Sequence, residues 1–73
     1  MERLLRYSFE HDRVIRMMLM DETGALSQVN ARVVRYDADS VDFITTRSPR
    51  TVTVPRKVIL AIDFRKGDDG QVI

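Results

Sequence analysis

The feature that most limits the fold of this chain is its alternation of apolar and polar residues, broken by clusters of turn residues. Alternation with a period of two places one face of a strand on a core and the other in water. The turn clusters recur at intervals of about 8–12 residues, a spacing typical of small barrels and sandwiches. Because tight turns join neighbouring strands, the pairing should be antiparallel. The sequence therefore predicts an all-β fold, a small antiparallel barrel of five to six strands.

The N-terminal part contains two apolar segments whose structure is open to two interpretations. In residues 5–9, Leu5, Tyr7 and Phe9 alternate with polar residues, which predicts a half-buried strand, although helix competes over residues 1–6. Residues 13–20 are apolar on both faces beyond Arg16, which predicts a strand covered on both sides, with helix as the alternative. A turn follows at residues 21–24, where glycine supplies the positive φ that a hairpin needs.

The remaining strands are marked more clearly. Residues 25–36 change the parity of their apolar positions near Val33 and Val34, which predicts a bulge or bend in one long strand. Such a bend lets one strand serve two sheets of a small barrel. After a turn at 37–40, strands are predicted over 41–46, 51–54 and 59–64, with Pro55 stopping the second of these. Residues 55–58 have room for a single helical turn.

Length and composition limit the classes of protein that this chain can represent. With 73 residues it allows one domain, expected over 1–66 and followed by a flexible tail over 67–73. The chain has no cysteine and one histidine, so neither disulfides nor a zinc site would add stability. A partner subunit is the remaining source of additional stability, and we therefore expect a homo-oligomer. No apolar run could span a membrane and no signal peptide is visible, which favours the cytoplasm.

Groups that could carry catalysis are few. Ser8, His11 and Asp12 are close in sequence, but a nucleophile, a base and an orienting acid need a geometry that sequence neighbours do not supply. The carboxylates of Asp37 and Asp39 fall in a turn, where aspartate bonds the local backbone. Phosphate-binding loops and nucleophile elbows are absent from the sequence. We therefore expect no enzyme activity, no cofactor and no metal.

The basic residues are distributed unevenly along the chain. Twelve lysines and arginines face 11 acids, so the net charge is only +1, which argues against a strong polyanion binder. From residue 43 to residue 62, however, the bases are Arg47, Arg50, Arg56 and Lys57, and no acid occurs. Such a window attracts nucleic-acid backbones and small anions. An ordinary charged surface, with its bases matched by acids, is the competing interpretation.

The best candidate for a binding site is the loop at residues 47–50, which carries two guanidiniums and a hydroxyl. We predict that an anionic ligand or single-stranded nucleic acid binds to Arg47, Ser48, Arg50, Arg56 and Lys57. The alternative function is structural, with strand edges building a dimer or ring. Met17, Met18 and Met20 lie on one predicted strand, and they suit either a core or a contact with another subunit.

Residues 41–62 resemble the second half of a WYL domain. A strand, Val41-Asp42-Phe43-Ile44-Thr45-Thr46, precedes a basic loop and the run from Arg50 to Ile62, and Leu5-Arg6-Tyr7 is similar to the first strand of that family. The Trp-Tyr-Leu signature is absent, and Val41-Asp42-Phe43 stands near its place. The order of strands is also similar to Sm-like, YolD-like and other SH3-like barrels. This resemblance implies a small barrel, a regulatory module that senses a ligand or nucleic acid, and ligand contacts near Arg47 and Arg50.

Overall fold

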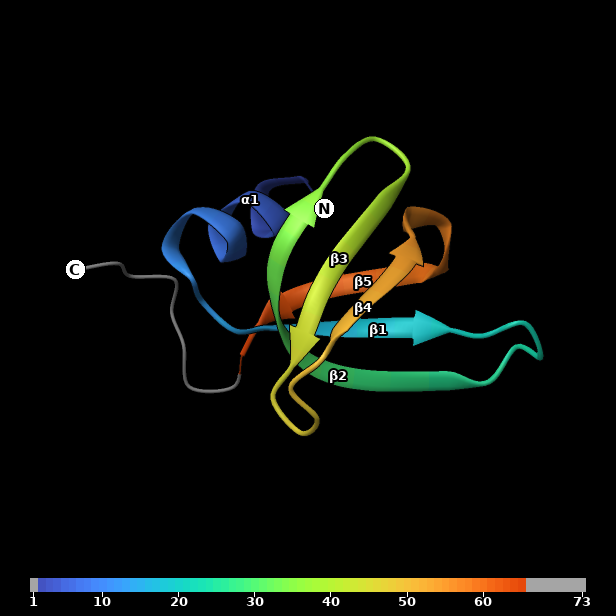
Figure 1. The fold of residues 1–73 in the computed structure, drawn as a ribbon. Coiled ribbons are helices and arrows are strands. Elements are labelled where there is room, and N and C mark those ends of the chain that lie inside the picture. The colour runs from blue at the N-terminus through green and yellow to red at the C-terminus, as the bar shows by residue number, and fades with distance from the viewer. Residues whose placement is uncertain (1, 66–73) are drawn as a thin grey trace.

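The computed structural model describes residues 2–65, which form one antiparallel sheet and an N-terminal helix (Figure 1). Helix α1 spans Glu2–His11 and is followed by β1 (Ile15–Met20), β2 (Leu26–Tyr36), β3 (Ser40–Thr45) and β4 (Thr51–Pro55). A single 3₁₀ turn, η1 (Arg56–Val58), leads into β5 (Ile59–Phe64). The strand order is β4-β3-β2-β1-β5, with every neighbouring pair antiparallel. The predicted antiparallel sheet and the helical turn before the last strand are therefore confirmed.

The all-β prediction is wrong at the N-terminus, because residues 5–9 belong to helix α1 and are not a strand. Leu5 and Ser8, three residues apart, are fully buried, whereas Phe9 is 49% exposed. Burial thus follows the helical spacing and not the alternation of Leu5, Tyr7 and Phe9. Arg6 pairs with Glu10 one turn later at 3.2 Å, a spacing available only on a helix surface.

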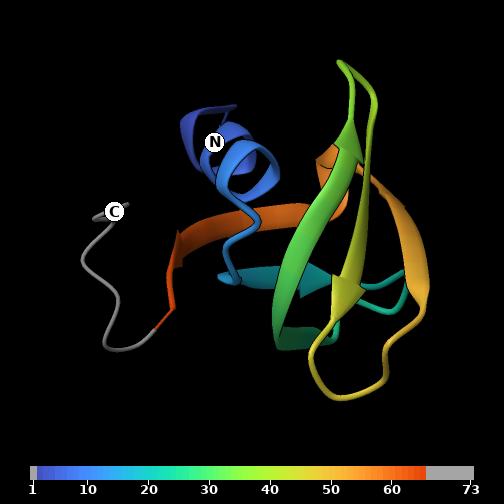
Figure 2. The same cartoon turned by 60° about the vertical axis from the view of Figure 1, so that its left-hand side comes forward.

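Helix α1 ends where Asp12 adopts a left-handed backbone conformation, with φ of 53°. The Arg13 N–H then reaches back to the Ser8 carbonyl oxygen at 3.1 Å, which satisfies an acceptor that the helix end leaves open. This termination turns the chain sharply into β1. It also leaves α1 lying across one end of the sheet, beside β2 and β5 (Figure 2).

The predicted bend in the long second strand is confirmed. Residues of β2 pair with β1 from Leu26 to Ala31 and with β3 from Ala31 to Tyr36, and the register shifts between Val33 and Arg35. One strand therefore joins two halves of a curved sheet (Figures 1 and 2). Gly24 has φ of 84° in the β1–β2 turn, as the hairpin prediction requires. Within residues 2–65, β4 and β5 are the outer strands of the sheet and do not pair with each other.

The core lies between the curved sheet and α1. Its fully buried apolar side chains come from α1 and from every strand except β4, and they are Leu5, Ile15, Met17, Ala31, Val33, Val41, Phe43 and Ile59. The valines of β4, Val52 and Val54, pack against this cluster from its edge. The tail predicted over 67–73 lies outside the described residues.

Among residues 2–65, no helix is both long enough and apolar enough to cross a membrane.

Candidate functional site

The predicted basic site is divided between the two ends of β4. Arg47, Ser48 and Arg50 lie on the β3–β4 loop, before β4, whereas Arg56 and Lys57 lie in η1, after it. Five strand residues separate these ends, and at a rise of about 3.3 Å per residue they span roughly 17 Å. The five residues therefore do not surround one small ligand.

The β3–β4 loop has a defined conformation. The Thr45 hydroxyl donates to the Ser48 carbonyl oxygen at 2.8 Å and accepts from the Ser48 N–H at 3.4 Å. The Arg50 N–H donates to the same Ser48 carbonyl oxygen at 2.7 Å. A further bond, from the Thr46 N–H to the Asn30 carbonyl oxygen at 3.0 Å, fixes the start of the loop to β2. These bonds position the loop without using either guanidinium.

Arg47 and Arg50 keep their charges unpaired within the described part of the chain. Both residues are exposed, and neither forms an ion pair with any of residues 2–65. By contrast, four other arginines pair with carboxylates: Arg6 with Glu10, Arg16 with Asp63, Arg32 with Asp12 and Arg56 with Glu2. The alternative interpretation, a charged surface whose bases are matched by acids, therefore holds for these four arginines. It does not hold for Arg47 and Arg50.

Arg56 is engaged inside the fold. Its guanidinium pairs with Glu2 of α1 at 2.8 Å, lies 5.8 Å from the centre of the Tyr36 ring, and is 22% exposed. The Arg56 N–H also donates to the Asp39 carbonyl oxygen at 2.9 Å, so the acidic β2–β3 turn lies beside η1. Arg56 therefore ties η1 to α1 and to that turn, and its charge is already balanced.

The acidic turn beside η1 uses its carboxylate locally. The Asp37 carboxylate accepts backbone N–H bonds from Asp39 and Ser40, both at 2.8 Å. These bonds favour the ionised carboxylate and lower the pKa of Asp37 below its ordinary value. The turn that accepts the Arg56 N–H bond therefore carries an ionised Asp37, which makes this end of β4 less favourable for an anion than the loop at the other end.

A hollow of about 350 Å³ opens beside the β3–β4 loop. The residues that line it come from β2 and from the end of β3, and they are Gln28, Val29, Asn30, Thr45, Thr46 and Arg47. Sequence reasoning did not select the first five of these. Alternation could place Gln28 and Asn30 on the outer face of a strand, but the pairing of β2 with β3 is what brings them next to Arg47.

The groups considered for catalysis and metal binding have other surroundings. The Ser8 hydroxyl is buried and bonded to backbone groups of Arg13 and Val33, while His11 lies against the Tyr7 ring at 5.8 Å. Within the part of the chain that the structure describes, no three histidine, aspartate or glutamate side chains lie close enough to hold a metal ion.

The β3–β4 loop, with the adjoining hollow, is therefore the surface of residues 2–65 that best fits an anionic group. Comparison of the whole chain with models of known protein families, with curated proteins and with solved structures gives no match.

Proposed function

We propose that this chain is a non-enzymatic binding module that takes an anionic ligand, such as single-stranded nucleic acid or a small anion, at Arg47, Ser48 and Arg50. The observation that carries the proposal is the pair of exposed guanidiniums on a loop that backbone bonds already hold in place. A preorganised loop loses less conformational freedom when it binds. Arg56 and Lys57, at the other end of β4, contribute at most to a longer ligand.

The proposal includes a small barrel of the Sm-like or SH3-like type. Supporting features are the strand order, the bent second strand and the 3₁₀ turn between the last two strands. The WYL-like segment corresponds to β3, β4, η1 and β5, and a regulatory role rests on that resemblance. Since unrelated functions share such barrels, the fold supports the proposal only indirectly.

Removing the loop charges is expected to weaken the binding of a fluorescent single-stranded oligonucleotide about ten- to a hundredfold at low salt. The double change Arg47→Ala with Arg50→Ala removes two exposed charged hydrogen-bond donors, each of which contributes about 0.7–1.4 kcal/mol. The measurement is fluorescence anisotropy at several salt concentrations, with a shallower salt dependence expected for the variant. Arg3→Ala with Arg35→Ala removes the same charge at two exposed positions outside the predicted site and should have little effect. Equal losses in the two variants would contradict a site at the loop.

Assembly through strand edges is the second candidate function. The sheet ends in β4 and β5, whose outer backbone edges have no partner strand among residues 2–65. On β5, Leu60 lies at a bulge opposite β1 and is 46% exposed. Of the methionines in β1, Met17 is buried in the core, whereas Met18 and Met20 are half-buried on the outer face. An open edge with apolar residues beside it is a surface that a second copy can extend.

Light scattering across a dilution series tests this assembly. If β5 is an interface, the mass at micromolar concentration exceeds that of one chain, and Leu60→Lys lowers it by placing a charge at the edge. Val34→Lys is the matched control, since Val34 is 38% exposed but lies in the part of β2 that pairs with β3. A mass of one chain at every concentration would rule out the assembly.

A further inference from the structure

The first half of β2 has an open backbone edge beside the β3–β4 loop. Over residues 26–30 this strand pairs with β1 on one side, whereas β3 ends at Thr45, opposite Ala31. This part of β2 therefore has an unpaired backbone edge on the β3 side, although β2 is the middle strand of the sheet. It lies next to Arg47, and it arises because β2 extends beyond its partner.

The hydrogen bonds of neighbouring residues show which backbone groups face this opening. Asn30 accepts from the Thr46 N–H, so its backbone groups point toward the β3 side, and Ala25 accepts from the Asp21 N–H, so its groups point toward β1. In an antiparallel ladder the direction alternates from one residue to the next. The N–H and C=O groups of Leu26 and Gln28 therefore point toward the side that β3 has left. No other strand among residues 2–65 lies there.

The surroundings of this edge match an extended peptide in several ways. The hollow of about 350 Å³ between residues 28–30 and 45–47 can hold a side chain of an added strand. The side chain of Leu26, which is 61% exposed, offers an apolar contact beside it. Arg47 borders the hollow, and Arg50 lies on the same loop, so an added strand would end against unpaired positive charge.

The geometry points to a short acidic peptide that adds as a strand to the edge of β2 at Leu26 and Gln28, with its carboxylates on Arg47 and Arg50. This inference rests on the proposed function, because the same two arginines take the anionic group. A peptide fits better than a nucleic acid here, since base stacking needs aromatic faces. Phe43 is buried, and the other aromatic rings of residues 2–65 contact one another near α1: Tyr7 with Phe64 and Phe9 with Tyr36.

The test uses the intact chain and a fluorescent hexapeptide of alternating glutamate and valine, with anisotropy as the measurement. Two further versions carry N-methyl groups, one on the glutamate nitrogens and one on the valine nitrogens, so each blocks a different edge of the peptide strand. Strand addition uses only one edge. One N-methylated version should therefore lose at least about tenfold in affinity, as expected for two or more backbone hydrogen bonds, while the other binds nearly normally.

Two controls locate the site on the protein. Arg47→Glu with Arg50→Glu should abolish binding of the peptide, whereas Arg3→Glu with Arg35→Glu, at two exposed positions outside the predicted site, should not, although both pairs change the charge equally. The amide hydrogens of Leu26 and Gln28 should also exchange more slowly when the peptide is bound, because they become donors in the new ladder.

The outcomes separate this inference from the proposed function. Equal affinity of the two N-methylated peptides would overturn strand addition, because charge alone would then explain binding. If a single-stranded oligonucleotide binds and the peptide does not, the inference of a peptide ligand is wrong, but the proposed function is still supported. If neither the peptide nor the oligonucleotide binds, both proposals fail. If binding is retained after charge reversal at Arg47 and Arg50, the β3–β4 loop is not the binding site in either proposal.

Discussion

Replacing Phe43 with alanine is expected to cost about 3–5 kcal/mol of unfolding free energy, the usual range for a large buried aromatic side chain. Phe43 is 1% exposed and lies in β3 between Val33 of β2 and Val52 of β4. Its loss leaves a cavity that two paired strands restrain from collapsing. A domain of this size has a total stability of only about 4–11 kcal/mol, so the variant should be close to unfolding.

Urea denaturation followed by far-UV circular dichroism measures this effect. Phe9→Ala is the matched control, because it removes the same atoms from a side chain that is 49% exposed. It loses mainly its contact with the Tyr36 ring, at 5.9 Å between ring centres, which is worth about 1 kcal/mol. Similar midpoints for the two variants would show that Phe43 is not at the centre of the core.

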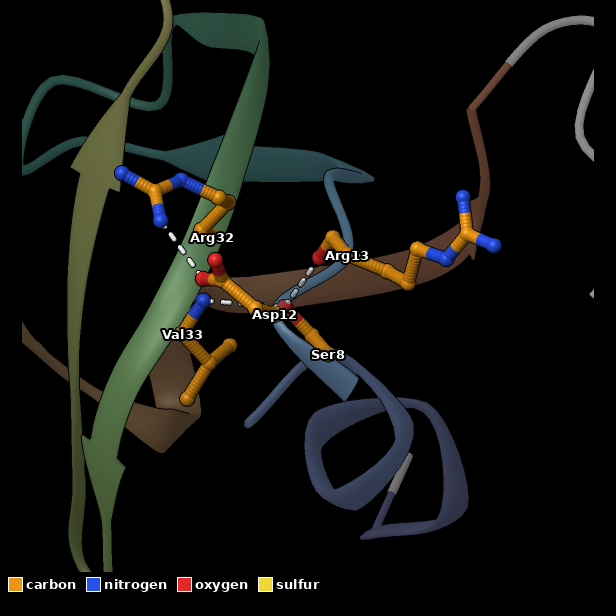
Figure 3. A network of polar contacts seen from close by, with 5 residues as sticks. All are labelled: Ser8, Asp12, Arg13, Arg32 and Val33. Carbon is orange, nitrogen blue, oxygen red and sulfur yellow. Dashed lines mark hydrogen bonds and ion pairs between the residues drawn. The ribbon is translucent and has the colours of Figure 1, made fainter. Parts of the chain in front are cut away.

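Replacing Ser8 with alanine is expected to cost about 2–3 kcal/mol, a large effect for the loss of one oxygen atom. The Ser8 hydroxyl is fully buried, donates to the Arg13 carbonyl oxygen at 2.6 Å and accepts from the Val33 N–H at 2.9 Å (Figure 3). By the alternation of the ladder, the Val33 N–H points to the β1 side of β2, beyond the last β1–β2 pair at Ile15 and Ala31, so this hydroxyl replaces a bond that the strand ladder does not supply. Each backbone group left buried without a partner costs about 1–3 kcal/mol.

Urea denaturation also measures the Ser8 variant, and hydrogen exchange at the Val33 amide gives a local measurement. Exchange at Val33 should become faster in Ser8→Ala, because its N–H loses its acceptor. Ser27→Ala is the control, since Ser27 is exposed on β2 and its hydroxyl has no hydrogen bond within residues 2–65. A loss of stability no larger than that of this control would contradict the linking role of Ser8 between α1 and β2.

The N-terminal segment shows why alternation alone was misleading. Leu5, Tyr7 and Phe9 alternate as in a strand, yet they lie in helix α1, which buries Leu5 and Ser8. Ser8 becomes a core residue because Val33 and Arg13 offer it bonds, and these lie 25 and five positions away. A serine in a sequence carries no mark of such burial. When a short segment fits both the strand period of two and the helix period of 3.6, the elements that it packs against decide which structure forms.

The candidate site was predicted in part. The basic window was visible because charge is a property of the sequence, and the break at Pro49 marked the loop. Which of its bases are already paired was not visible, since the Glu2 that neutralises Arg56 is 54 positions distant. Gln28 and Asn30 were missed for the same reason, because only strand pairing places them beside Arg47.

The sequence by itself determined the positions of the five strands after residue 14, the positive-φ turn at Gly24, the bend in β2 and the stop at Pro55. Each of these follows from local chemistry: side-chain alternation, the freedom of glycine and the missing N–H of proline. The tertiary structure decided that residues 2–11 form a helix, that Arg47 and Arg50 keep their charge free of partners among residues 2–65, and that β2 extends past β3. These outcomes depend on which distant segments meet, because ion pairs, burial and strand edges are properties of the folded chain.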